Sequence, residues 1–134
     1  MPPDVDRIGI VGVGVQATWQ AVFACAIRPV RTIYFYSRSD EGAKRFSAAV
    51  SRHVPGVSLI PCRDVEDLLA QSPVVIAATT ANAPVLPARQ ELLENRHFVG
   101  VGSFKPAMQE LPAIVYQLAR EVVVDSDAAK AEGR

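Results

Sequence analysis

The sequence predicts an α/β fold built on a parallel, doubly wound sheet. Short runs rich in β-branched residues alternate along the chain with longer amphipathic stretches, which is typical of repeated strand–helix units. The strand-like runs are almost continuously apolar, as in strands that are buried on both faces of a sheet. A glycine-rich turn follows the first run. At 134 residues, the chain fits one domain of this class, spanning 1–134.

The first half of the chain indicates three strands and two helices. The stretch 15–27 is mostly apolar and predicts a buried helix. Ser39 or Asp40 can cap a second helix, which ends before the turn signal at 53–56. The strands are predicted from apolar, β-branched and aromatic runs. They are 7–14, 31–37 and 57–61.

The second half continues the alternation. Asp64 can cap a short helix over 64–71, and a proline-containing loop at 82–87 and a polar turn follow the run 73–80. A last helix is expected over 110–119. The remaining strands are 73–80, 97–102 and 121–126. We expect the six strands to lie in the order 3-2-1-4-5-6.

The composition argues against several classes of function. Fourteen basic residues balance fourteen acidic ones, so no net charge attracts nucleic acid or an anionic membrane. Cys25 and Cys62 are too few for a disulfide framework, and the polar N-terminus is unlike a signal peptide. We therefore expect a cytoplasmic protein. His53 and His97 have no partners at metal-ligand spacing, so no metal is expected.

The turn after the first predicted strand, 12–17, fits the pattern G-x-G-x-x-A. Gly12 permits a tight turn, Gly14 leaves backbone N–H groups open to a pyrophosphate, and Ala17 lets the helix pack close to the strand. The N-terminus of the following helix offers free N–H donors and the positive end of its dipole to the phosphates. Glycines also close turns that are purely structural. The strand–turn–helix context favours dinucleotide binding and a Rossmann fold.

The end of the second predicted strand bears on the choice of cofactor. NAD-binding sites carry an Asp or Glu near this position, which binds the ribose 2′-hydroxyl. Here the residues are Ser37, Arg38 and Ser39. Arg38 can pair with a 2′-phosphate, and the two hydroxyls can donate to it. We therefore expect NADP, with NAD as the alternative if Arg38 is only a solvated loop residue; Asp40 is the residue that could favour NAD.

Two further strand ends supply candidate contacts. Thr79 and Thr80 end the fourth predicted strand, beside the crevice where the strand order reverses. Their hydroxyls can meet the ribose or the nicotinamide, or merely cap the following turn. Val101 ends the fifth predicted strand at the same edge. The sequence contains no Ser/His/Asp set, so no catalytic residue is assigned.

Longer stretches of the chain carry a more specific signal. They are GVGVQA (12–17), YSR (36–38), AATTANAPVL (77–86), VGVGSFKPAMQELP (99–112) and EVVVDSDAAKAEG (121–133). In order and spacing they resemble the ornithine cyclodeaminase/mu-crystallin family, over nearly the whole chain. The phrase ending in ELP is much more specific than the glycine motif. The resemblance is nearest to the branch of pyrroline-2-carboxylate and piperideine-2-carboxylate (ketimine) reductases.

The resemblance implies the Rossmann domain of a homodimeric oxidoreductase that reduces a cyclic imine with NAD(P)H. In that family a second domain binds the substrate and forms the dimer. This sequence resembles the Rossmann part alone, so the chain is expected to be a piece of a longer protein and inactive by itself. Carried over by motif, the pyrophosphate would be held by Gly14, Val15 and Gln16, and the 2′-phosphate by Ser37, Arg38 and Ser39. The nicotinamide half would lie along Thr79, Thr80, Ala81 and Val101.

One departure from the family pattern bears on the reaction. Phe104 stands where cyclodeaminases carry an aspartate, six residues before the pair Glu110-Leu111. Phenylalanine can neither accept a proton nor activate water, so imine reduction is expected in place of cyclodeamination. The alternatives are an ornithine cyclodeaminase and a non-catalytic, NADP-dependent ligand-binding protein of the mu-crystallin type. An S-adenosylmethionine-dependent methyltransferase would need an acidic residue where Ser37 and Arg38 stand.

Overall fold

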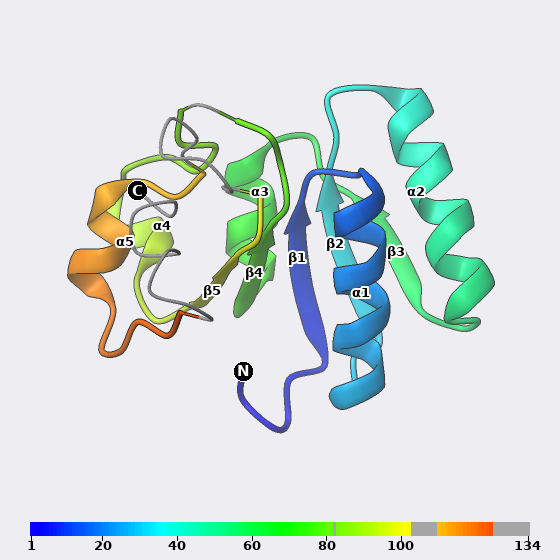
Figure 1. The fold of residues 1–134 in the computed structure, drawn as a ribbon, viewed down its shortest axis with the longest axis horizontal. Helices are drawn as coiled ribbons and strands as arrows, with labels where there is room; N and C mark the ends of the chain where they lie inside the picture. The colour runs from blue at the N-terminus through cyan, green and yellow to red at the C-terminus, as the bar shows by residue number, and fades with distance from the viewer. Residues whose placement is uncertain (82, 103–109, 125–134) are drawn as a thin grey trace.

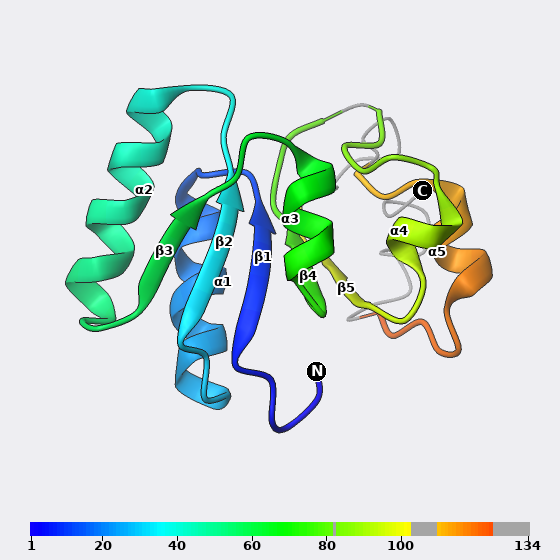
Figure 2. The same ribbon diagram turned by 180° about the vertical axis from the view of Figure 1, so that it is seen from behind.

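A computed structural model describes residues 1–81, 83–102 and 110–124 of the chain. These residues form a five-stranded sheet with helices on both faces (Figures 1 and 2). The strand order is β3-β2-β1-β4-β5, and every neighbouring pair is parallel. The prediction of a doubly wound α/β fold is therefore confirmed, and the first five strands have the expected order.

All the strands are short. They are β1 (Arg7–Val11), β2 (Thr32–Tyr36), β3 (Ser58–Pro61), β4 (Val74–Ala77) and β5 (His97–Gly100). The helices are α1 (Val15–Ile27), α2 (Asp40–His53), α3 (Val65–Gln71), α4 (Gln90–Leu93) and α5 (Ala113–Leu118). The one-turn helix α4 was not predicted, and α5 begins only after Pro112. Within the described residues, no helix has the length and apolarity needed to cross a membrane.

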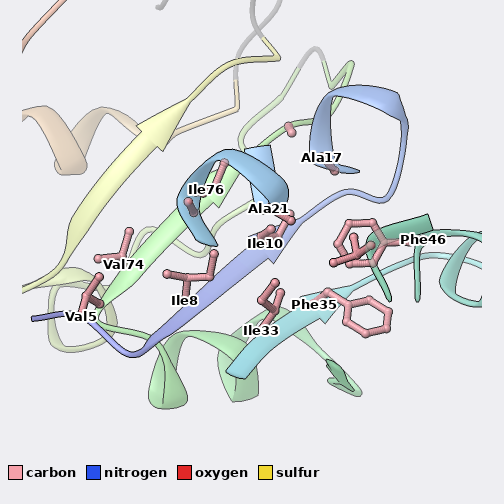
Figure 3. Packing of buried hydrophobic residues seen from close by; sticks show 13 residues of the cluster. Val5, Ile8, Ile10, Ala17, Ala21, Ile33, Phe35, Phe46, Val74 and Ile76 are labelled. Atoms are coloured by element: carbon pink, nitrogen blue, oxygen red, sulfur yellow. The ribbon is translucent and has the colours of Figure 1, made fainter. Parts of the chain in front are cut away.

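Each face of the sheet has its own core. On the face covered by α1 and α2, Ile10 of β1 and Ile76 of β4 pack with Ala21 and Phe46 (Figure 3). The alternate residues of β4 point to the opposite face, where Ala77 joins a cluster formed with α3, α4 and α5. All four residues of β4 are buried. This confirms that the central apolar run is a strand covered on both faces.

The first helix is buried on one side only, contrary to the prediction of a buried helix. Its buried residues are small, namely Ala17, Ala21 and Ala24. The larger apolar residues, exposed by 41–74%, are Val15, Trp19, Phe23 and Ile27. Trp19 stacks on Phe23 with ring centroids 6.0 Å apart and meets His53 edge-on at 4.9 Å. The small side chains bring the helix close to the sheet and leave the large ones outside.

The sixth predicted strand, 121–126, is not found in the part of it that the structure describes. Residues 121–124 have no regular secondary structure and are exposed. Residues 125 and 126 lie outside the described residues. β-propensity reflects how well a run packs on a pleated, half-buried sheet surface, and the exposed valines at 122–124 pack on none. The β-branched composition of this run was therefore not sufficient to specify a strand.

The buried thiol of Cys62 should make stability depend on pH. Burial, followed by the charges of Asp67 and Asp64, raises its pKa from 9.0 to about 11. Between these two values the unfolded chain loses the proton and the folded chain keeps it, so the free energy of unfolding falls as pH rises. Urea denaturation at pH 8 and pH 10.5 should therefore show a larger drop for the wild type than for Cys62→Ala. Equal drops in the two proteins would contradict this account.

Candidate functional site

The predicted cofactor contacts all follow the carboxyl ends of adjacent parallel strands, at the edge of the sheet that lies at the top of Figure 1. They are Gly12, Gly14, Val15, Gln16, Ala17, Ser37, Arg38, Ser39, Thr79, Thr80, Ala81 and Val101. The chain after β1 crosses to the face of α1, whereas the chain after β4 leads to α4 on the other face. Ligands of open α/β sheets bind at such a switch point.

Gly12 occupies a position that only glycine can take without strain. Its φ is 104°, and a Cβ there would lie 2.5 Å from the carbonyl oxygen of Ala78. The Gly12 amide donates to the carbonyl oxygen of Tyr36 at 3.2 Å, while the Ala78 amide donates to the oxygen of Val11 at 3.0 Å. The turn therefore hydrogen-bonds to the end of β2 and packs closely against the end of β4. This fixes where α1 starts.

The N-terminus of α1 faces open space. Gly14 is the N-cap residue and has no side chain with which to cap the first turn. A Cβ at this position would meet nothing within 4 Å. The first turn of α1 contains no acidic residue, while Ala17 is fully buried against the core. Free N–H groups and the positive end of the helix dipole thus meet at a place where an anion has room.

In the loop after β2, some of the polar groups form hydrogen bonds with one another or with the start of α2. The Ser37 hydroxyl donates to the Ser39 carbonyl oxygen at 2.9 Å and accepts from the Ser39 amide at 3.2 Å. The Ser39 hydroxyl accepts from the Gly42 amide at 3.1 Å and so caps α2, as predicted. Arg38 is exposed and makes no hydrogen bond to any described residue. Of the side chains at 37–39, the Arg38 guanidinium and the hydroxyl hydrogen of Ser39 can donate to a ligand.

Sequence reasoning missed Gly42, which joins this loop to the glycine turn. A Cβ at Gly42 would lie 2.9 Å from the Ser39 hydroxyl, 3.0 Å from a methyl group of Val13 and 3.1 Å from the Ser37 hydroxyl. The first turn of α2 therefore packs directly on both loops. The available signal was a glycine inside the first turn of a helix, where its low helix propensity needs a reason.

Sequence reasoning also missed the buried carboxylate of Glu110, which is 2% exposed. One oxygen, Oε2, accepts from the Thr79 amide at 2.5 Å and from the Thr79 hydroxyl at 2.8 Å. The other, Oε1, accepts from the Gly102 amide at 2.6 Å. The Thr79 hydroxyl also accepts from the Ala81 amide at 3.2 Å, so it caps the turn that follows β4. The sequence singled out Glu110 only as part of a family motif.

The other residues after β4 and β5 differ in exposure. Thr80 is exposed, whereas Ala81 and Val101 are half-buried. Phe104, the position at which the family pattern changes, lies outside the described residues. Among the described residues, no group of three His, Cys, Asp or Glu side chains is placed to hold a metal ion. The groups that this edge offers to an anion are the amides at the start of α1 and the exposed Arg38 guanidinium.

The fold and the glycine turn place the chain among proteins of the Rossmann type. Residues 1–134 match the ornithine cyclodeaminase/mu-crystallin family, and the chain belongs to that family, as its motifs predicted. It is 32% identical over 120 residues to a Delta(1)-pyrroline-2-carboxylate reductase of Bacillus thuringiensis subsp. konkukian, covering 90% of this chain and 36% of that relative.

Two solved structures extend the comparison. The Delta(1)-pyrroline-2-carboxylate reductase of Thermococcus litoralis, in complex with NADH and L-proline, matches with a TM-score of 0.76 and 27% identity over 85% of this chain and 35% of that one. An archaeal alanine dehydrogenase dimer with bound NAD matches with a TM-score of 0.81 and 25% identity over 96% of this chain and 39% of that one. The chain thus spans somewhat more than a third of the length of the relatives it matches.

Alanine should destabilise the fold at one of the two turn glycines and have little effect at the other. Gly12→Ala should lower the free energy of unfolding by about 1–3 kcal/mol, because it forces a side chain into a left-handed conformation and against the Ala78 carbonyl. Gly14→Ala should stay within about 0.5 kcal/mol of the wild type, because its φ of −78° suits alanine and its surroundings are open. The lower entropy of the unfolded chain with alanine offsets the weaker N-cap preference of that residue. Urea denaturation followed by circular dichroism measures both. Similar losses for the two variants would contradict the described turn.

Proposed function

We propose that this chain is the NAD(P)-binding part of an oxidoreductase that reduces a cyclic imine such as pyrroline-2-carboxylate. The observation that carries the proposal is the open, uncapped N-terminus of α1 at Gly14, set at the switch point by the tight turn at Gly12. A dinucleotide pyrophosphate has the charge and shape that this place accepts. The likeness to reductases, one of them described with NADH, supports both the cofactor and the reaction.

The residues of this edge divide between the two halves of the cofactor. The amides of Gly14, Val15 and Gln16 would hold the pyrophosphate at the end of α1. Arg38 and Ser39 would meet the adenosine ribose, and Thr80 and Val101 lie on the side left for the nicotinamide. When bound, the cofactor would supply the hydride, and the task of the chain is to orient it.

We further propose that the cofactor is preferentially NADP. The exposed Arg38 guanidinium has no partner among the described residues, and no carboxylate occupies 37–39 at the end of β2. Asp40 and Glu41 lie in the first turn of α2, where acidic residues stabilise a helix N-terminus. Ser39 caps this helix, and the place of Asp40 in its first turn supports a structural role for that carboxylate, which leaves Arg38 to the 2′-phosphate.

Replacing the arginine should separate the two cofactors. Arg38→Ala should weaken NADP⁺ binding about tenfold or more, since hydrogen bonds to charged groups contribute about 1.5–3 kcal/mol, and should barely change NAD⁺ binding. Isothermal titration calorimetry measures both affinities. Arg52→Ala, an exposed arginine in the last turn of α2, is the matched control and should change neither. Equal losses for NADP⁺ and NAD⁺ in Arg38→Ala would contradict the assignment.

The reaction itself can be tested in a chimera in which this chain replaces the matching segment of the Bacillus thuringiensis reductase. We expect the chimera to oxidise NADPH with pyrroline-2-carboxylate, and Gly14→Ala to lower that rate at least about tenfold by crowding the pyrophosphate. The chain alone should bind NADPH without turnover. A chimera that binds NADPH but does not reduce the imine would favour the ligand-binding alternative, and ammonia release from ornithine would favour a cyclodeaminase.

The assembly and the location of the protein are also proposals. The family resemblance and the likeness to an alanine dehydrogenase described as a dimer support a homodimer. The likeness to pyrroline-2-carboxylate reductases supports a cyclic imino acid as the small-molecule partner. The balanced charge of the chain supports a protein that binds neither nucleic acid nor membrane, and we propose a cytoplasmic location.

A further inference from the structure

Glu110 is the only buried charged residue among the described part of the chain. Two amides, those of Thr79 and Gly102, and the Thr79 hydroxyl donate to its carboxylate. Burying a carboxylate is costly and is tolerated only when hydrogen bonds replace its hydration. An apolar side chain of similar volume can serve stability as well as a buried charge does, which suggests that the carboxylate is used to fix geometry.

The bonds to Glu110 begin where the ladder between β4 and β5 ends. The last paired residues are Ala77 and Gly100, and one further bond runs from the Val101 amide to the Ala77 carbonyl oxygen. Beyond that point, the amides of Thr79 and Gly102 are joined through the two oxygens of one carboxylate. The carboxylate therefore holds together two strand ends that the sheet no longer pairs.

Two neighbouring features fit this arrangement. Gly102 has no Cβ, and an added one would overlap the Thr79 carbonyl oxygen and lie 2.6 Å from Oε1 of Glu110. The Glu110 main-chain oxygen accepts from the Val85 amide at 2.8 Å, which ties in the loop after β4. The adjacent Leu111 is buried in the core against α3, α4 and α5. Glu110 is thus held by hydrogen bonds to the strand ends, and Leu111 is held by apolar packing in the core.

We propose that Glu110 is a positioning residue for the nicotinamide half of the bound dinucleotide. It fixes the backbone at Thr79, directly before Thr80 and Ala81, and at Gly102, next to Val101; Thr80, Ala81 and Val101 are the residues available to that half. It makes none of its recorded bonds to the turn at 12–17 or to the loop at 37–39, which serve the adenosine and pyrophosphate half. The inference rests on the proposed dinucleotide function. It states that the carboxylate of Glu110 positions the residues of the nicotinamide half of the site.

Glutamine cannot replace Glu110 in this arrangement. The carboxylate offers acceptors only, whereas a carboxamide has one acceptor oxygen and one NH₂ donor. If the NH₂ replaces Oε1 it opposes the Gly102 amide, and if it replaces Oε2 it opposes the Thr79 amide. Either orientation places two donors against each other and leaves a buried N–H without an acceptor. Glu110→Gln therefore disturbs one strand end while keeping the size of the side chain.

The test compares a whole cofactor with a ligand for its adenosine half. NADP⁺ and 2′,5′-ADP are titrated by calorimetry into the wild-type chain, Glu110→Gln, and the exposed control Glu121→Gln. We expect Glu110→Gln to weaken NADP⁺ binding about tenfold and 2′,5′-ADP binding less than about twofold. The control should change neither. A uniformly loosened fold would weaken both ligands together.

A second pair of variants covers the case in which Glu110→Gln does not fold. Thr79→Val removes the hydroxyl that donates to the carboxylate and accepts from the Ala81 amide, and Thr79→Ser keeps it. We expect a loss of NADP⁺ affinity of about threefold in Thr79→Val alone, with 2′,5′-ADP unchanged in both. Circular dichroism establishes which variants are folded at the titration temperature.

The outcomes separate this inference from the function on which it rests. Equal losses for NADP⁺ and 2′,5′-ADP, or no loss for either in a folded Glu110→Gln, would overturn the positioning role. Wild-type binding of 2′,5′-ADP with no added affinity for NADP⁺ would overturn it as well, because the nicotinamide half would then have no site. If the wild-type chain bound neither ligand, the proposed dinucleotide function itself would fail.

Discussion

The reversal of the chain at Gly12 determines where α1 begins, and the start of α1 determines the candidate cofactor site. The turn hydrogen-bonds to the end of β2 and leaves no room for a side chain against the end of β4. Only a left-handed glycine satisfies both neighbours. Because the helix then starts over the switch point between β1 and β4, its dipole and free amides point to the place where an open α/β sheet binds ligands.

The two halves of this edge are built by different physical means. The adenosine side depends on missing side chains: Gly12 and Gly42 let the ends of β1, β2 and the start of α2 approach one another closely. The opposite side depends on one buried carboxylate, Glu110, whose oxygens replace ladder hydrogen bonds between Thr79 and Gly102. The closely packed glycines tolerate only small changes in side-chain volume. At the position of Glu110, the amides of Thr79 and Gly102 require two acceptor atoms.

The sequence was sufficient for the features that depend on local patterns. Apolar runs, helix caps at Ser39 and Asp64 and the turn at 12–17 are each specified by neighbouring residues, and the order of five strands follows from repeated strand–helix units. The sequence was misleading where the burial of a segment depends on the rest of the fold. An apolar run at 15–27 gave a helix with an exposed face, and a β-branched run at 121–124 gave no strand. Glu110 bonds to Thr79, 31 residues away, and no local pattern indicates that contact.

The central claim is that a dinucleotide binds at the carboxyl edge of the sheet, with its pyrophosphate at the start of α1. A ¹H–¹⁵N NMR titration of the chain with NADP⁺ tests it directly, because each amide reports its own surroundings. The account predicts that the largest shifts fall on the amides of Gly14, Val15 and Gln16, with smaller ones at 37–39. Shifts concentrated instead along the groove lined by Phe23, Ile27 and Val99 would contradict it.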